Sequence, residues 1–119
     1  MKFSRVEVIT GISKITALQK ALSRFNISGM TVYQVLGCGV QHGTQEFETE
    51  EHKDIQLLPK EVVMFVLPSE ETPALVEFLK KELYTGHIGD GKIFISDITT
   101  LVRVRTGEEG KAALIDDGL

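Results

Sequence analysis

The glycine-rich run from Gly86 to Lys92 is the part of this sequence whose residue types and spacing most directly suggest chemistry. It reads Gly-His-Ile-Gly-Asp-Gly-Lys and therefore matches most of the phosphate-binding pattern G-x-x-x-x-G-K-[ST]. However, Ile93 stands where that pattern needs a hydroxyl for Mg²⁺, and a strand pattern follows where a helix should begin. Two interpretations stay open. Backbone N–H groups approach an anion beside the point charge of Lys92, or the run is a structural tight turn.

Three further cations are candidates for holding an anion. Arg103 and Arg105 stand two residues apart in an alternating segment. On a strand they would project from one face, where two guanidinium groups can grip phosphate oxygens. A solvated strand face is the alternative. Lys60, near the end of a long polar stretch, leaves the same two interpretations open.

The stretch from Gly37 to Lys60 is too long for a structureless connection inside a compact domain, which indicates a functional or disordered loop. Between Thr44 and Gln56 it carries five acidic residues and one lysine, so this segment has a charge of −4. Such a tip is typical of a contact surface, although a solvated loop without a partner is the alternative. Gln41 offers a carbonyl oxygen that could ligate Mg²⁺ beside phosphates.

The remaining polar residues carry no enzyme signature. We find no Cys-His or Ser-His-Asp order that fits a nucleophile and its base, and the three histidines lack the spacing of metal ligands. We therefore expect no catalytic residues and expect surface histidines. A metal site at His42 and His52, which flank the acidic tip, is a weakly signalled alternative.

Composition excludes two classes of partner and indicates a compartment. The formal charge of −4 argues against a nucleic-acid binder, which would need clustered Lys and Arg. The sequence contains no apolar run long enough to span a membrane and no signal-peptide pattern. Cys38, the only cysteine, cannot form an intramolecular disulfide. These features predict a cytoplasmic protein.

The elements that would position these residues form one predicted domain over residues 1–119. Alternation and β-branched runs predict strands at Phe3–Ile9, Met30–Leu36, Val62–Leu67 and Ile93–Arg105. Helical spacing predicts a helix from a Ser13 cap to Phe25, closed by Asn26 and Gly29. A second helix is predicted from Ser69 to Leu83, with Pro73 in its first turn.

This order predicts an α+β fold. Two β-α-β units joined by a long loop give a ferredoxin-like (βαββαβ) sandwich, in which two helices cover one face of an antiparallel sheet. The other face of the sheet would need a cover. Another copy of the chain is the economical cover, so we expect a homo-oligomer with the bare sheets turned inward.

Two runs of the sequence closely resemble the PII signal-transduction proteins. They are Tyr84–Phe94 (YTGHIGDGKIF) and Val102–Glu108 (VRVRTGE), and the likeness extends through Ile27–Val32 and Leu57–Lys60 to nearly the whole chain. The resemblance implies a homotrimer of ferredoxin-like subunits with three clefts between subunits that bind ATP or ADP in competition. It also implies a long T-loop, at about residues 39–58, which docks on transporters, enzymes or regulators, in nitrogen metabolism among other settings.

The resemblance assigns residues to the two sides of each cleft. Carried over by position, one side would hold Gly39, Gln41, Lys60, Gly89, Gly91 and Lys92, and the neighbouring subunit would supply Gly29, Met30, Thr31, Val66, Arg103 and Arg105. Lys92 and the two arginines would hold phosphates. In family members that sense 2-oxoglutarate, the glutamine matching Gln41 ligates Mg²⁺ with ATP and the oxoacid. The lysine matching Lys60 pairs with the oxoacid's carboxylate, so Mg²⁺ and 2-oxoglutarate are open as further ligands.

The predicted T-loop departs from the family pattern. Many bacterial members carry an arginine, a tyrosine-arginine-glycine stretch and a second, modifiable tyrosine, where this chain has Val40, Glu48–Glu50 and Lys53. No tyrosine lies between Gly39 and Lys60, which excludes uridylylation there. We therefore expect a PII-like regulator whose acidic loop selects an unusual client, such as a membrane transporter with a basic cytosolic face.

Two alternatives belong to other classes. One is slow nucleotide hydrolysis in the same cleft, for which the sequence offers no recognisable general base. The other is a metal-tolerance protein of the similar trimeric CutA type, in which His42 and His52 would be important.

Overall fold

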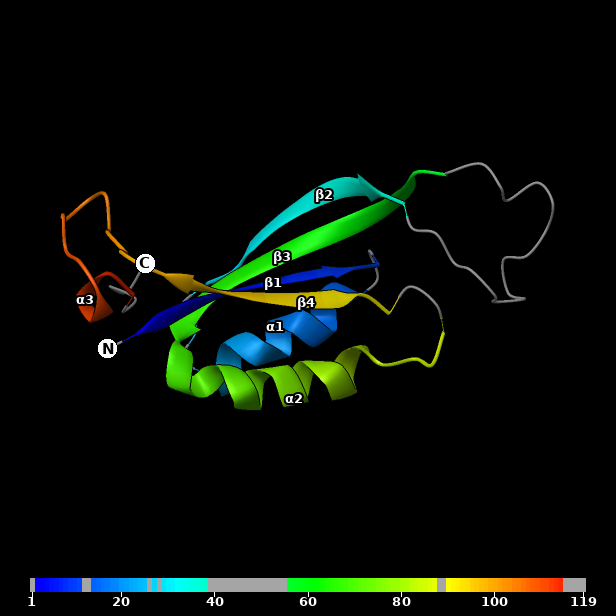
Figure 1. The fold of residues 1–119 in the computed structure, drawn as a ribbon, viewed down its shortest axis with the longest axis horizontal. Coiled ribbons are helices and arrows are strands. Elements are labelled where there is room, and N and C mark those ends of the chain that lie inside the picture. The colour runs from blue at the N-terminus through cyan, green and yellow to red at the C-terminus, as the bar shows by residue number, and fades with distance from the viewer. Residues whose placement is uncertain are drawn as a thin grey trace.

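The computed structural model describes residues 2–11, 14–25, 27, 29–38, 56–87 and 90–114. Four strands form an antiparallel sheet in the order β2-β3-β1-β4, and two helices lie against one face of it (Figure 1). The predicted α+β, ferredoxin-like arrangement is therefore confirmed. In chain order the elements are β1 (Phe3–Thr10), α1 (Ile15–Arg24), β2 (Thr31–Gly37), β3 (Leu58–Pro68), the 3-10 turn η3 (Ser69–Glu71), α2 (Thr72–Leu83), β4 (Lys92–Ile98) and α3 (Lys111–Leu114).

The core lies between the sheet and the two long helices. Val6 and Val8 of β1 pair with Phe65 and Val63 of β3, and all four side chains are completely buried. They share one face because side chains alternate along a strand and paired residues point the same way. Leucines at helical spacing cover them, namely Leu18 on α1 and Leu75, Leu79 and Leu83 on α2. Burial of this apolar face is what holds α1 and α2 to the sheet.

The ends of the helices follow partly from local sequence. The second helix begins through η3, where the Thr72 hydroxyl donates a 2.7 Å hydrogen bond to the Ser69 carbonyl, and Pro73 fits in its first turn as predicted. Ser13 and Asn26, the caps predicted for the first helix, lie outside the described residues. Among the helices described, none is long and apolar enough to cross a membrane.

The sheet face turned away from α1 and α2, here called the open face, carries a row of large side chains. The register aligns Tyr33, Val62, Ile9 and Lys92 across the four strands. The next row on the same face aligns Thr31, Met64, Glu7 and Phe94. Tyr33 is 43% exposed and Phe94 52%, so apolar surface remains on this face of the protomer. No described helix covers it (Figure 1).

The prediction of a strand from Ile93 to Arg105 is wrong for its second half. The last strand, β4, ends at Ile98, which pairs with Phe3 at the very start of β1. Beyond this pair β1 offers no further residue for ladder hydrogen bonds. The chain instead bends at Thr99, and Val102 forms an isolated antiparallel bridge with Glu109. Alternation along a segment does not reveal the length of the strand beside it, which explains the error.

The third strand is longer than its apolar run. It begins at Leu58, four residues before the predicted Val62, and pairs with β2 down to Gly37. This pairing places Lys60 on a strand opposite Val35, whereas the sequence suggested the end of a loop. The two strands extend as a ribbon past the helices (Figure 1), and Leu36 and Leu58 on it are 65% and 48% exposed.

Candidate functional site

The glycine-rich run is organised around the carboxylate of Asp90. Its Oδ2 atom accepts hydrogen bonds from the backbone N–H groups of Thr85 at 2.8 Å and Gly86 at 3.1 Å. Its Oδ1 atom accepts the Thr85 hydroxyl, and the Thr85 hydroxyl oxygen accepts the backbone N–H of His87 at 3.2 Å. The N–H groups at the start of the run are therefore already bound within the protein. An anion would have to be met by the later residues of the run.

These hydrogen bonds make Asp90 a source of pH-dependent stability. The Thr85 hydroxyl and then the Thr85 N–H are the largest causes that hold the pKa of Asp90 below its ordinary value of 3.8, helped by the Gly86 N–H and the charge of Lys14. A carboxyl whose pKa is lower in the folded than in the unfolded protein stabilises the fold above the unfolded pKa. That stabilisation is lost as the pH falls through the folded pKa.

We therefore expect Asp90→Asn to melt below the wild type at neutral pH, and the gap between the two melting temperatures to narrow as the pH falls below about 4. Thermal melts from roughly pH 3 to pH 7 would measure this. Asp97→Asn, at an exposed position on β4, is the matched control. A gap between wild type and Asp90→Asn that is equally wide at every pH would contradict the expectation.

The end of the run is packed tightly on β1. Thr10 is buried, with 1% of the residue exposed, and its hydroxyl donates a 3.1 Å hydrogen bond to the Asp90 carbonyl. Gly91 follows with φ of +110°, and a Cβ built on it would lie 2.3 Å from the Ile9 carbonyl oxygen. Only glycine fits this approach of two backbones. The run thus leaves its turn and enters β4 at a fixed point.

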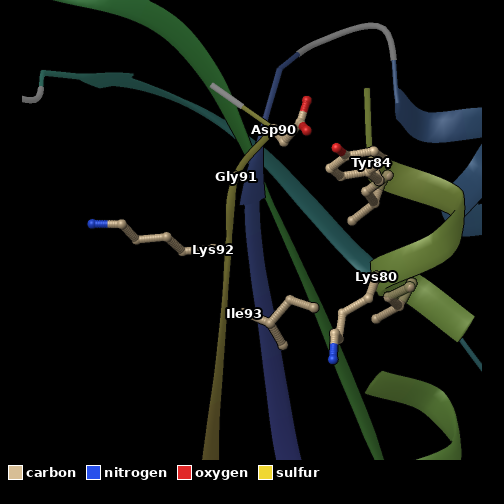
Figure 2. Close-up of a pocket in the computed structure, with 8 residues that line it drawn as sticks. Lys80, Tyr84, Asp90, Gly91, Lys92 and Ile93 are labelled. Atoms are coloured by element: carbon tan, nitrogen blue, oxygen red, sulfur yellow. The ribbon is translucent and has the colours of Figure 1, made fainter. Parts of the chain in front are cut away.

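Lys92 and Ile93 diverge at this point. Figure 2 shows their side chains on opposite sides of the strand, with Ile93 directed toward α2 and Lys92 away from it. Lys92 pairs with Ile9 and lies on the open face, where it is exposed. Lys60, two strands away and half-buried, lies on the same face. At about 4.8 Å per strand the two lysines flank a strip of sheet roughly 10 Å wide.

A pocket of about 250 Å³ lies on the helix side of the run. Its walls come from the end of α2, the glycine-rich run and the start of β4, and are Leu79, Lys80, Leu83, Tyr84, Asp90, Gly91, Lys92 and Ile93 (Figure 2). Apolar side chains dominate this surface. The charged end of Lys92 leads away from the pocket, so the pocket and the lysine do not form one anion site within a protomer.

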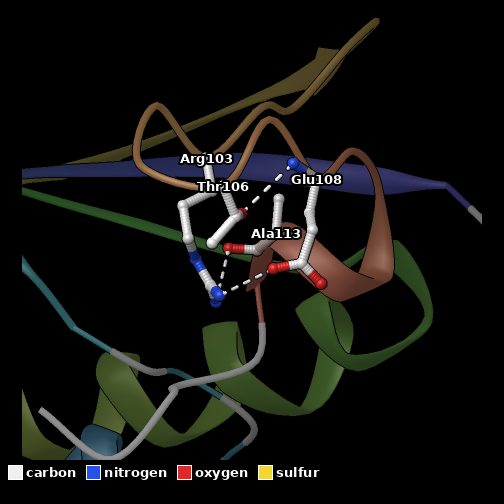
Figure 3. A network of polar contacts seen from close by, with 4 residues as sticks. All are labelled: Arg103, Thr106, Glu108 and Ala113. Atoms are coloured by element: carbon white, nitrogen blue, oxygen red, sulfur yellow. Dashed lines mark hydrogen bonds and ion pairs between the residues drawn. The ribbon is translucent and has the colours of Figure 1, made fainter.

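Arg103 is held by its own C-terminal neighbours. Its Nη1 atom donates to Glu108 Oε1 at 3.1 Å, and its Nη2 atom donates to the Ala113 carbonyl at 3.4 Å (Figure 3). Its backbone N–H also donates to the Glu108 carbonyl at 2.9 Å. The side chain is 18% exposed, so these contacts fix the guanidinium group in one orientation while leaving part of it at the surface.

The prediction that Arg103 and Arg105 project from one strand face is wrong. Residues 104–106 form a turn, closed by a 2.8 Å hydrogen bond from the Gly107 N–H to the Arg103 carbonyl and by Gly107 at φ of +73°. Arg105 therefore lies in an exposed turn and Arg103 at its base. Val104, the first residue of this turn, is 97% exposed.

The predicted residues fall at opposite ends of the sheet. Lys60, Gly91 and Lys92 lie at the end where β3 and β4 begin. Val66 pairs with Arg5, and Thr31 with Met64, toward the other end, and Arg103 follows beyond the end of β4 (Figure 1). Lys60 and Val66 are six residues apart on one strand, or roughly 20 Å at about 3.4 Å per residue. Within one protomer these residues form two separate groups.

Gly29 and Met30 complete the second group, directly before β2. Gly29 is exposed, Met30 packs partly against the core, and Thr31 begins the strand. Gly39, Gln41 and Gly89 of the first group lie outside the described residues, as do His42 and His52. In the parts of the chain that the structure describes, no three His, Cys, Asp or Glu side chains gather as a metal site.

Sequence reasoning missed four residues that shape these two groups. Asp90, Thr85 and Thr10 hold the glycine-rich run, and Glu108 holds Arg103. One signal was available: Asp and Thr beside glycine in a turn commonly bind nearby backbone groups. The contacts from Thr10 and Glu108 depend on the register of β1 and on the turn at Gly107, which the sequence pattern did not predict.

Fold and site together define a small α+β protein with two cation-bearing ends. The family model for the nitrogen regulatory protein P-II matches residues 3–108. The chain belongs to this family of nitrogen regulatory proteins.

Relatives and solved structures agree with this assignment. The chain is 36% identical over 109 residues to nitrogen regulatory protein GlnK of Escherichia coli K12, covering 92% of this chain and 97% of the relative. It is 43% identical over 101 residues to nitrogen regulatory protein P-II 2 of Methanothermobacter thermautotrophicus, covering 85% and 88% of the two chains. The structure of a B. subtilis GlnK–ATP complex matches with a TM-score of 0.79 at 29% identity, covering 95% and 96%. Arabidopsis thaliana PII bound to citrate matches at 0.74 and 31%, covering 94% and 92%.

Proposed function

We propose that this chain is a cytoplasmic P-II-type regulator that forms a homotrimer, binds ATP or ADP in clefts between subunits, and controls a protein client through its T-loop. Lys60, Gly91 and Lys92 of one subunit would face Arg103 and Arg105 of the next across each cleft. Gly39, Gln41 and Gly89 would join the first side, and Gly29, Met30, Thr31 and Val66 the second. Lys92 and the arginines would hold the phosphates.

The observation that most supports this proposal is the separation of the two groups of residues within a protomer. A nucleotide that contacts Lys92 and Arg103 at once needs two protomers, because the two residues lie at opposite ends of β4. The apolar open face gives such an assembly a surface to bury. The ATP complex of the B. subtilis relative supports an adenine nucleotide as the ligand.

The kind of client protein is proposed from the charge of the acidic segment between Thr44 and Gln56. The segment between Thr44 and Gln56 carries −4 and joins the far end of the β2–β3 ribbon. A strongly acidic segment favours a partner with a basic surface and disfavours an acidic one. A membrane transporter with a basic cytosolic face fits this requirement. Nucleotide occupancy would shift the population of loop conformations and so engage or release the client.

Two further features of the proposal concern the ligands. Gln41 and Lys60 are retained from the pattern of members that sense 2-oxoglutarate with Mg²⁺, so both are proposed as additional ligands of the same cleft. The proposal contains no catalytic step. The match to P-II over residues 3–108 favours a regulator over a nucleotide hydrolase or a metal-tolerance protein.

Calorimetry with ATP, ADP and AMP, each with and without Mg²⁺ and 2-oxoglutarate, tests the proposal. We expect micromolar binding of ATP or ADP and its loss in an Arg103→Ala, Arg105→Ala double variant, because two charge-assisted contacts to phosphate disappear. A Lys2→Ala, Lys81→Ala double variant removes the same charge at two exposed positions and is the control. Equal binding by wild type and the arginine variant, or a monomer in sedimentation, would refute the proposal.

A further inference from the structure

In the glycine-rich run, the carboxylate of Asp90 takes the place that the anion of a ligand could otherwise occupy. Asp90 accepts the backbone N–H groups of Thr85 and Gly86 and the Thr85 hydroxyl, which are the kind of donors that glycine turns offer to phosphates. An ionised carboxylate only accepts hydrogen bonds, so it pairs with these donors and has no donor of its own that would need an acceptor. The first turn of the run is therefore complete before any ligand arrives.

Asp90 is also held from the opposite side. Its carbonyl accepts the buried Thr10 hydroxyl of β1 at 3.1 Å, while its side chain binds the turn that follows α2. The next residue, Gly91, is pressed against the Ile9 carbonyl, and Lys92 comes directly after it. One residue thus connects the end of α2, the end of β1 and the start of β4.

From these contacts we infer that Asp90 is a positioning residue, which orders the glycine-rich run so that Lys92 and the later N–H groups meet the phosphates of a bound nucleotide. The inference rests on the proposed function. It gives Asp90 an indirect role, because its carboxylate is turned to Thr85 and Gly86 and is occupied there.

Charge compensation is the second part of the argument. A carboxylate beside a phosphate site would repel the nucleotide if its charge were unpaired. The Thr85 hydroxyl and two N–H groups point their positive ends at Asp90 and reduce this repulsion, and they also hold its pKa low, so the group stays ionised. Removal of the Thr85 hydroxyl should therefore weaken phosphate binding, although this hydroxyl is turned to the Asp90 carboxylate.

The test compares ATP with adenosine in Asp90→Ala, Asp90→Asn and Thr85→Val, with Asp97→Asn as the control. We expect Asp90→Ala to weaken ATP by roughly 10- to 100-fold and to leave adenosine within about twofold, because ordered phosphate contacts are lost and the nucleoside contacts stay. Asp90→Asn keeps one acceptor oxygen and should lose less, roughly 3- to 10-fold, and Thr85→Val should resemble it.

Three results would overturn the inference. They are unchanged or tighter ATP binding in Asp90→Ala, an equal loss of ATP and adenosine, and a normal ATP affinity in Thr85→Val. Amide hydrogen exchange of the nucleotide-free protein provides an independent readout. The N–H groups of Thr85 and Gly86 should exchange slowly in the wild type and at least about tenfold faster in Asp90→Ala. If the wild type binds no ATP, the proposed function fails, and exchange rates that Asp90→Ala leaves unchanged would then refute the ordering role by themselves.

Discussion

Mixed trimers of Lys92→Ala and Arg103→Ala subunits are expected to bind ATP although neither variant binds it alone. In the proposed arrangement, each pure variant trimer would lack one phosphate contact in every cleft. In the proposed arrangement, one cleft of a mixed trimer would join an intact Lys92 on one subunit to an intact Arg103 on the next, because the two residues lie at opposite ends of the protomer. With random assembly from equal amounts, about one quarter of all clefts would be restored.

Two tags on coexpressed subunits allow the mixed trimers to be purified, and titration with ATP should then find about one working cleft in three. A mixture of Arg103→Ala with Arg105→Ala is the matched control. Both changes fall on the same side of the cleft, so no arrangement of these subunits restores a complete site. Failure of the first mixture to bind, or recovery in the second, would mean that the phosphate contacts do not cross a subunit boundary in the proposed way.

The second large effect is expected from Gly91→Ala. The new Cβ would lie 2.3 Å from the Ile9 carbonyl oxygen and 3.1 Å from Thr10 Cβ, at a φ of +110° that side chains disfavour. Backbone atoms on both sides must then move. This movement would disturb the pairing of β4 with β1, the strand beside it in the sheet. We expect the free energy of unfolding to fall by about 2–4 kcal/mol, and the melting temperature by roughly 10–20 °C.

Gly11→Ala is the control for this change. Gly11 lies directly after β1, and nothing comes within 4 Å of a Cβ built there. That substitution should change stability by less than about 1 kcal/mol. Chemical denaturation at a fixed protein concentration would compare both variants, because an oligomer gains stability with concentration. A Gly91→Ala protein as stable as Gly11→Ala would contradict the close packing of the run on β1.

Much of the fold followed from the spacing of apolar residues. Val6 and Val8 alternate toward the helices, and Leu75, Leu79 and Leu83 recur at helical spacing, so the layers could be predicted from the sequence. The length of the strands could not be predicted equally well. The last strand stops at Ile98 because β1 begins at Phe3, and this limit is a property of the pairing between strands.

The candidate site, too, could be predicted from the sequence only in part. Residue types identified Lys92 and the two arginines as cations, but the alternation that placed Arg103 and Arg105 on one face failed at the turn of residues 104–106. The role of Asp90 was not predicted, because a glycine-rich run suggests N–H groups that face a ligand. In the structure, its first N–H groups face the carboxylate of the run itself. Such internal pairing depends on distances that spacing along the chain does not contain.

The β2–β3 ribbon has a packed inner part and an exposed outer part. Its inner part contributes Val63 and Phe65 to the core, whereas Leu36 and Leu58 at its outer part are 65% and 48% exposed. The acidic segment between Thr44 and Gln56 follows that outer part in the sequence. Side chains at the outer part of the ribbon can therefore change with little loss of buried apolar surface, and so at little cost to the stability of the protomer.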